Sequence, residues 1–357
     1  MMEKSVLNPN QIWIFVVLVH IAGSVMVSLM GVIPLGTAVL SGVICFFAGN
    51  IIERKPKNYL LCILCWILSL LIMNALDREM QASFLLNELL FVCAVWIGKR
   101  GYVKTEAYCG LKKISVKMLV PIICIAVLLF IMAGYVNACS MIVFQNYVTS
   151  SIETIKNVPL AGLAVAAIAP AVVEELYFRG FIYRGMNNKL QAVLLSSLLF
   201  ALLHMNFNQM CYAFVMGLFF AAVVCVTDNL TISILLHMIF NSFTVFSICF
   251  ENSPIVQKIM AFQLNGYRIF QSVVMDSQGN IHPEWLFTGG IIALFSLAGA
   301  AGLLILLSKM QKKMMERSIG ELTKETKMVS FVWKPDLKFY VGCAICLLVA
   351  VLYEFFL

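Results

Sequence analysis

The chain has 357 residues, of which 62% are hydrophobic and only 12% are charged. A typical soluble domain has roughly 25% charged residues and about 45–50% apolar ones. So few charges cannot cover a water-facing surface, which excludes a soluble globular fold. Each membrane-spanning helix needs about 20 apolar residues. The composition therefore predicts an all-α fold, a polytopic transmembrane helical bundle.

The formal net charge of +7 does not indicate a nucleic-acid partner. The basic residues gather in short clusters between apolar runs, as they do in the cytoplasmic loops of membrane proteins. Most of the 12 cysteines lie inside the apolar runs. That placement favours packing between helices over a disulfide framework or a metal site.

About eleven apolar runs follow one another along the chain, and each predicts a spanning helix. We expect a four-span N-terminal extension over 1–117, a core over 118–250, and a C-terminal part over 251–357 that contains a cytoplasmic amphipathic helix or linker at 309–338. The runs lie near residues 12–33, 36–52, 59–76, 81–98, 118–139, 158–187, 190–206, 210–227, 230–250, 286–308 and 339–357.

The basic clusters between these runs predict the orientation of the chain. With about eleven spans and a cytoplasmic N-terminus, every cluster falls on the inside, as the positive-inside rule requires. The clusters are Arg54, Lys55 and Lys57; Lys99, Arg100, Lys104, Lys112, Lys113 and Lys117; Arg179, Arg184 and Lys189; and the seven lysines and Arg317 of 309–338.

Ionisable side chains inside a membrane are costly and mark candidate functional sites. The segment 169–180 is the richest in them. Glu175 and Arg179 lie four residues apart on a helix, with the acid first, which is the better order for pairing. Glu174 points about 100° away from Glu175. We therefore expect one neutralised carboxylate and one that is available for proton transfer, the alternative being a purely structural buried ion-pair network.

Two later spans of this region, 190–206 and 230–250, carry polar groups at the same spacing. Phe200 and His204 share one helix face, and so do His237 and Asn241. Each pair alone is weak evidence for a site. Because buried polar groups must find partners, three adjacent spans with such groups indicate convergence on one site.

Glu-Glu-x-x-x-Arg, Phe-x-x-x-His and His-x-x-x-Asn occur on successive predicted helices. In this order they resemble the motifs of the CAAX protease and bacteriocin-processing (CPBP) family of intramembrane endopeptidases, which includes the type II CAAX prenyl proteases. The resemblance covers roughly residues 118–250.

The resemblance implies a peptide hydrolase and a role for each motif residue. Glu174 would act as general base and activate a water together with His204, while His237 and Asn241 would stabilise the oxyanion. The supporting residues are Glu175, Arg179 and Phe200.

The resemblance also implies a membrane-embedded peptide or protein substrate, lipidated or not. It places the chain as a multi-pass protein in a cell membrane, if bacterial, or in the endoplasmic reticulum, if eukaryotic. Relatives have been described in both metal-dependent and glutamate-dependent terms. A zinc site would use Glu174, His204 and His237, but Asn241 is a poor zinc ligand and no His-Glu-x-x-His occurs. We favour the version that requires no cofactor.

Two other functions remain open: a catalytically silent scaffold or immunity protein, and a proton-coupled transporter.

One geometric difficulty concerns the depth of His204 in the membrane. His204 lies near the outer end of its predicted span, and helix rise leaves roughly 10 Å between its depth and that of Glu174. A short, tilted or kinked span at 190–206, or a water-filled cavity, would remove this difference in depth.

Four polar residues are left outside the predicted site. We expect His20 to be a packed or hydrogen-bonded residue and His282 to be solvated in a loop. Asn87 and Glu88 are interpreted as interhelical contacts, with a place in a substrate path as the alternative.

Overall fold

The structure, a computed structural model, describes residues 8–30, 63–64, 66–72, 78–101, 110–144, 154–250, 252–257, 283–318 and 332–356. Within these ranges the chain is helical and contains no strand, which confirms the predicted all-α class. The predicted run at 36–52, half of the run at 59–76, the cluster Arg54 to Lys57, and His282 lie outside them.

Each of the other nine predicted runs is a helix in the structure. Six helical stretches are long and apolar enough to cross a membrane, and three apolar helices are shorter. Helix α15 continues through the first ten residues of the polar segment 309–338. The elements are α1 (Pro9–Met30), α4 (Arg78–Gly101), η1 (Val116–Met118), α6 (Leu119–Ser140), η2 (Thr154–Asn157), α8 (Pro159–Leu163), η3 (Ala164–Ile168), α9 (Ala169–Glu175), η4 (Leu176–Tyr183), α10 (Lys189–Leu203), α11 (Phe207–Thr227), α12 (Leu230–Cys249), α15 (Pro283–Ser318) and α16 (Leu337–Phe356).

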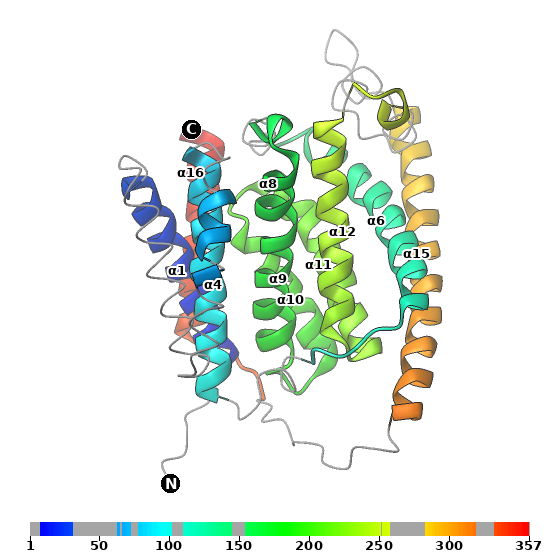
Figure 1. The fold of residues 1–357 in the computed structure, drawn as a ribbon, viewed down its shortest axis with the longest axis horizontal. Helices are drawn as coiled ribbons and strands as arrows, with labels where there is room; N and C mark the ends of the chain where they lie inside the picture. Colours follow the sequence, from blue (N-terminus) through cyan, green and yellow to red (C-terminus); the bar gives the residue numbers. More distant parts are fainter. Residues whose placement is uncertain are drawn as a thin grey trace.

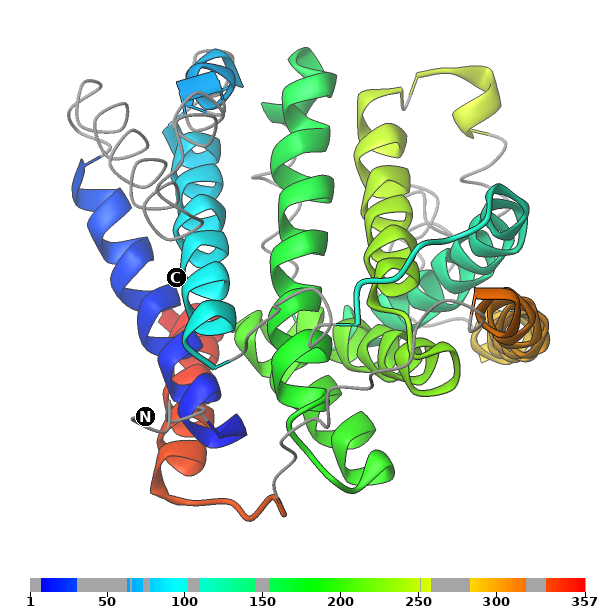
Figure 2. The same ribbon diagram turned by 60° about the horizontal axis from the view of Figure 1, so that its bottom comes forward.

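A central rod, formed by α8, η3, α9 and η4 in line, divides the bundle (Figure 1). Helices α1, α4 and α16 lie on one side of the rod, and α12, α6 and α15 lie on the other, as the tilted view also shows (Figure 2). The first and last helices pack together, since the Trp13 indole of α1 donates to the Phe339 carbonyl of α16 at 3.3 Å. The predicted N-terminal and C-terminal parts therefore share a core with the central segment.

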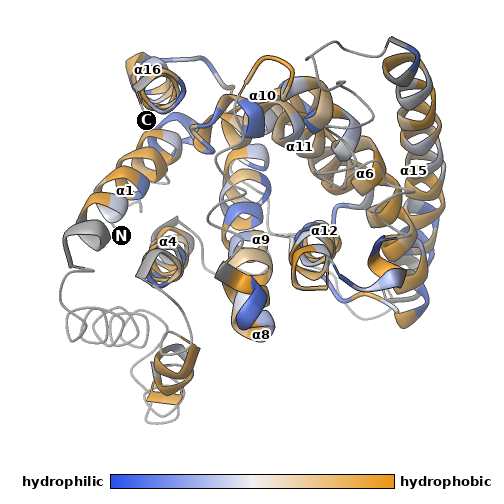
Figure 3. Ribbon diagram, turned by 90° about the horizontal axis from the view of Figure 1, so that it is seen from above, coloured by the Kyte–Doolittle hydropathy of each residue, from blue (hydrophilic) through white to orange (hydrophobic). Residues whose placement is uncertain are grey.

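Large apolar side chains are exposed on the outer helices, and much of the helical ribbon is coloured as hydrophobic in the view from above (Figure 3). Helix α15 exposes large side chains such as Phe287, Phe295 and Ile305, and α16 exposes Leu348 and others. A surface of this kind is suited to lipid rather than to water. Together with the six long apolar helices, it indicates an integral, multi-pass membrane protein.

The central rod changes its helical pitch on either side of the two glutamates. Pro170 has no N–H and its ring crowds the carbonyl four residues earlier, which disturbs a regular α-helix. The wide π-helical segment Ala164–Ile168 directly precedes this proline, and a second one, Leu176–Tyr183, directly follows Glu175. Such segments are often found at functional sites. They place Glu174 and Glu175 at the end of the short α9.

Three successive helices begin with the same local signal. Each of α10, α11 and α12 is preceded by an asparagine whose side-chain oxygen accepts from a backbone N–H of the first turn, which satisfies a donor that the helix itself leaves free. The pairs are Asn188 with Gln191 (3.1 Å), Asn206 with Gln209 (2.9 Å) and Asn229 with Thr231 (3.0 Å). These caps define sharp turns at both ends of the α10–α11 hairpin.

Residues of two predicted basic clusters meet at one end of the bundle. The Asp228 carboxylate lies 2.5 Å from the Lys112 ammonium and 2.8 Å from the Arg184 guanidinium. Burial alone would raise the pKa of Asp228, but the Arg184 and Lys112 charges outweigh it and hold that pKa below its ordinary value. Lys112 and Arg184 thus lie at the same end of the bundle, as the predicted topology requires. Arg179, predicted to belong to the same cluster as Arg184, is instead fully buried in an ion pair with Glu175, so its assignment as an orientation signal was wrong. The side of the membrane that this end faces stays a prediction.

Gly110 is required beside this cluster. Its φ is +69°, and a Cβ at this position would lie 2.0 Å from an Arg184 guanidinium nitrogen. We expect Gly110→Ala to lower thermal stability in detergent by about 1–3 kcal/mol, because it combines backbone strain with a steric clash. Gly302→Ala on α15 is the matched control, since a Cβ there meets nothing within 4 Å. Equal melting temperatures for the two variants would contradict this account.

Candidate active site

A fully buried ion pair forms the base of the candidate site. The Arg179 guanidinium donates to Glu175 Oε1 at 2.8 Å, and both side chains have no exposed surface. This is the pairing that their spacing predicts. Ser233 donates to the other carboxylate oxygen at 2.7 Å, His237 Nδ1 lies 3.2 Å from Oε1, and Arg179 donates to the Gly217 carbonyl at 2.9 Å. The Glu175 carboxylate is therefore enclosed by groups from η4 and α12, and Arg179 links the pair to α11.

Aromatic rings enclose this pair. The Arg179 guanidinium lies 4.5 Å from the centre of the Phe200 ring and 5.5 Å from that of Phe220. The Phe220 ring in turn stacks on His237, with centroids 4.8 Å apart. The close approach needs Gly217, where a Cβ would lie 3.2 Å from both Arg179 and Phe200. The predicted supporting role of Phe200 thus has a physical basis, since its ring faces a buried cation.

Glu174 points away from this ion pair and lines a cavity of about 230 Å³. Its side chain keeps 24% of its surface exposed, and its Oε2 lies 3.8 Å from His237 Nε2, which is longer than a hydrogen bond. His237 therefore stands between the two glutamates, with one ring nitrogen toward each. The two adjacent carboxylates have different environments, as the 100° helical offset predicts.

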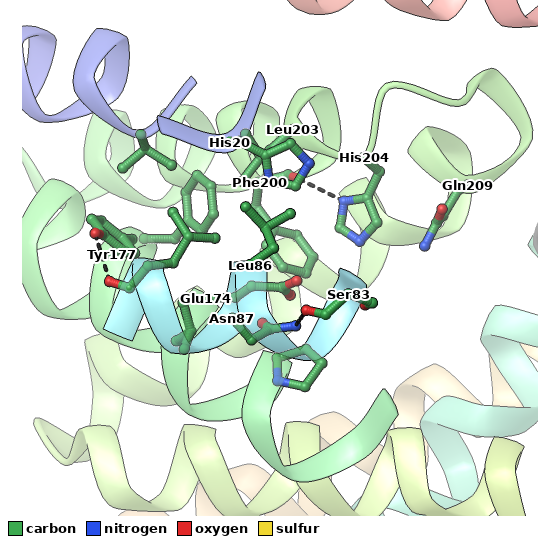
Figure 4. A pocket seen from close by; sticks show the side chains of 15 residues that line it. His20, Ser83, Leu86, Asn87, Glu174, Tyr177, Phe200, Leu203, His204 and Gln209 are labelled. Carbon is green, nitrogen blue, oxygen red and sulfur yellow. Dashed lines mark hydrogen bonds between the residues drawn. The ribbon is translucent and has the colours of Figure 1, made fainter. Parts of the chain in front are cut away.

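His204 lines the same cavity as Glu174 (Figure 4). Helix α10 has only 15 residues, and the chain turns at His204 and Met205, the latter with a φ of +51°. A short span is one of the arrangements that bring His204 to the depth of Glu174, and it is the one observed. His204 Nδ1 lies 2.8 Å from the Phe200 carbonyl. Because a carbonyl can only accept, Nδ1 carries a proton, and in the neutral ring the Nε2 lone pair is left for a ligand in the cavity.

Asn241 is the predicted residue that does not join the others. It follows His237 by one turn of α12 and is half-buried. It is not among the residues that line the cavity, and neither is His237, whose link to the cavity is its contact with Glu174.

The cavity also includes polar residues that lie outside the predicted set. His20 of α1, Ser83 and Asn87 of α4, and Gln209 of α11 all line it. Sequence reasoning set His20 aside as a packed residue and Asn87 as an interhelical contact. The signal that could have found them is their polarity inside apolar runs. For Glu88 the prediction is confirmed, since its carboxylate is hydrogen-bonded to the Ser69 hydroxyl.

The zinc alternative of Glu174, His204 and His237 was tested against the geometry. In the part of the chain that the structure describes, no three His, Cys, Asp or Glu side chains are grouped so that they could hold a metal ion. These three residues all belong to that part. The donor set, as it is arranged in the structure, does not fit a zinc site.

The central part of the chain has a recognisable family likeness. Residues 156–243 match the model of the type II CAAX prenyl endopeptidase Rce1-like family. The matched segment contains all three motifs and confirms the expected resemblance for that segment. It is shorter than the 118–250 core expected from the sequence, because it begins after α6. No curated protein and no solved structure matches the chain.

The two adjacent glutamates give a test of their different environments. We expect Glu175→Gln to destabilise the protein by about 3–5 kcal/mol, because it leaves the buried Arg179 charge without its counter-ion. Glu174→Gln should change stability little, since Glu174 is partly exposed and makes no short ion pair. Thermal unfolding in detergent compares the two variants, and equal losses would contradict the assignment.

Proposed function

We propose that this protein is an intramembrane endopeptidase that hydrolyses a peptide bond of a membrane-embedded peptide or protein. The observation that carries the proposal is the sharing of one cavity by Glu174 and His204, while the neighbouring Glu175 is fully neutralised. Its support is the likeness of residues 156–243 to a CAAX endopeptidase family.

The proposed reaction begins with a water held between the Glu174 carboxylate and His204 Nε2. Glu174 takes one proton from the water as its oxygen forms a bond with the carbonyl carbon of the substrate. The carbonyl oxygen becomes the oxyanion of a tetrahedral intermediate. The C–N bond then breaks, and the proton held by Glu174 passes to the leaving nitrogen. The products are a carboxylic acid, which keeps the second proton of the water, and an amine.

His237 is the proposed donor to the oxyanion. Its Nδ1 faces the acceptor Glu175, so Nε2 can donate only when the ring carries both protons. In that form the charges of Glu174, Glu175, Arg179 and His237 are two negative and two positive, and they cancel. A neutral cluster is the least costly one to hold within a bilayer.

Asn241 is proposed as the second oxyanion donor, a role that the family resemblance implies. If it has this role, Asn241→Ala should lower kcat by about 10²–10³. A variant with nearly normal kcat would show instead that its half-buried amide stays outside the cavity during the reaction. Ser242→Ala is the matched control, because this neighbouring hydroxyl donates only to its own helix, at the Met238 carbonyl.

The substrate class, a prenylated CAAX protein, is proposed from the matched family, which is described as a type II CAAX prenyl endopeptidase. Two internally quenched peptides separate the possibilities, one with an S-farnesyl cysteine upstream of the cleaved bond and one without the lipid. Faster cleavage of the first would assign a prenyl protease. Equal cleavage would assign a protease that acts on membrane peptides in general. The proposed location is the cell membrane in a bacterium or the endoplasmic reticulum in a eukaryote.

Glu174→Gln tests the mechanism itself. We expect it to abolish cleavage of both peptides by at least about 10³-fold, because the variant lacks the general base, while insertion and melting temperature remain close to normal. Unchanged activity of a folded variant would exclude the glutamate mechanism. Chelator treatment is the parallel control, and inhibition that zinc reverses would overturn the metal-free version.

The remaining functions are outcomes of the same assay. A folded wild-type protein that cleaves neither peptide would favour a silent scaffold or immunity protein. Proton-coupled uptake by that protein in vesicles would favour a transporter.

A further inference from the structure

The cavity beside Glu174 is built from two regions of the chain. Nine of its fifteen lining residues lie within the matched segment, and six belong to helices α1 and α4, far outside it. The six are Val16 and His20 of α1, and Ser83, Leu86, Asn87 and Leu90 of α4. The N-terminal helices thus form one wall of the candidate site, opposite the rod that carries Glu174 (Figure 4).

His20 has an unusual environment on this wall. Its Nδ1 is buried and finds no hydrogen-bond partner among the residues that the structure describes. A buried polar atom without a partner costs about 1–3 kcal/mol. The mechanism proposed above does not use this imidazole, although it lines the cavity that holds Glu174 and His204. The imidazole is thus a polar group of the cavity wall to which the proposed mechanism assigns no role.

Asn87 presents a second polar group on the same wall. Its amide nitrogen donates to the Ser83 carbonyl of its own helix at 2.9 Å. That hydrogen bond uses the donor side of the amide, so the side-chain oxygen is left to accept from another group. Together, α1 and α4 offer the cavity an imidazole nitrogen and an amide oxygen in otherwise apolar surroundings, which include Val16, Leu86 and Leu90.

These groups have the chemistry that a peptide backbone needs. In an extended segment every N–H and C=O lacks an internal partner, whereas in a helix they are satisfied within the segment. An extended peptide beside Glu174 would be removed from water and would need hydrogen bonds from the wall. Hydrolysis also requires an exposed carbonyl, which an intact helix does not offer.

We propose that His20 and Asn87 hold the backbone of the substrate in an extended form beside Glu174, and so act as positioning residues from outside the matched segment. The proposal rests on the proposed function and deepens it, because it specifies an unfolded peptide segment as the substrate. The N-terminal helices then form part of the site and not merely an addition to it.

The first test separates binding from stability. His20→Leu should raise KM for the quenched peptides by roughly 3- to 10-fold with little change in kcat, because one substrate hydrogen bond is lost. The same variant should melt at the same temperature as the wild type or higher, since the unpaired Nδ1 is removed. His20→Asn, which keeps a polar side chain at this position, should have a KM close to that of the wild type.

Ser24→Ala is the matched control on the same helix. The Ser24 hydroxyl donates only to the His20 backbone carbonyl, and the residue does not line the cavity. Its KM and kcat should stay at the wild-type values. A lower melting temperature for His20→Leu with unchanged KM would show that His20 has a structural role and would overturn the proposal. Equal KM increases for His20→Leu and His20→Asn would also overturn it.

The second test addresses the substrate backbone directly. Peptides that are N-methylated at successive positions near the cleaved bond each lack one N–H donor. At one position, methylation of the peptide should raise the KM of the wild type by about the same factor as the Asn87→Leu substitution raises it for the unmethylated peptide. In the Asn87→Leu variant, methylation at that position should raise KM no further. Additive effects at every position would contradict a hydrogen bond between Asn87 and the backbone.

The two proposals fail in distinguishable ways. If the folded wild type cleaves neither quenched peptide, the proposed function fails and this inference fails with it. If the wild type cleaves and Glu174→Gln does not, while His20→Leu and Asn87→Leu keep the wild-type KM, only this inference fails.

Discussion

The buried ion pair between Glu175 and Arg179 is the interaction on which the candidate site depends. A charge that has no exposed surface requires an equally buried counter-charge, and hydrogen bonds to its remaining polar atoms lower the cost further. Glu175 also accepts from Ser233 of α12, and Arg179 donates to the Gly217 carbonyl of α11, while its Nε has no hydrogen-bond partner among the described residues. The pair therefore ties the central rod to two other helices and sets the orientation of the residue next to it.

That neighbour is Glu174. The packing of the helices gives the two adjacent carboxylates different surroundings. One is surrounded by donors and has no freedom to exchange a proton. The other lies one residue earlier, faces a cavity, and has only a long contact with His237. Because His237 reaches both carboxylates, the structural pair and the reactive group are linked through one imidazole. A carboxylate that faces an open cavity is the arrangement that water activation requires.

Much of the fold and part of the site could be predicted from the sequence. The apolar runs predict the helices because spanning segments must be long and continuous in hydrocarbon. The pairing of Glu175 with Arg179 and the opposite orientation of Glu174 follow from helical periodicity alone. The depth of His204 could not be predicted, because it depends on where α10 ends. The turn at Met205 and the cap at Asn206 set that end point.

The sequence by itself determined the membrane class, the helical segments and the chemistry of the three motifs, since these depend on composition and on contacts within a few residues. Only the tertiary structure decided which polar groups share a cavity. It placed His20 and Asn87 beside Glu174, although they lie more than eighty residues away along the chain, and it left Asn241 outside the cavity lining. The physical reason is that packing between distant helices selects the faces that meet, and no local periodicity records that choice.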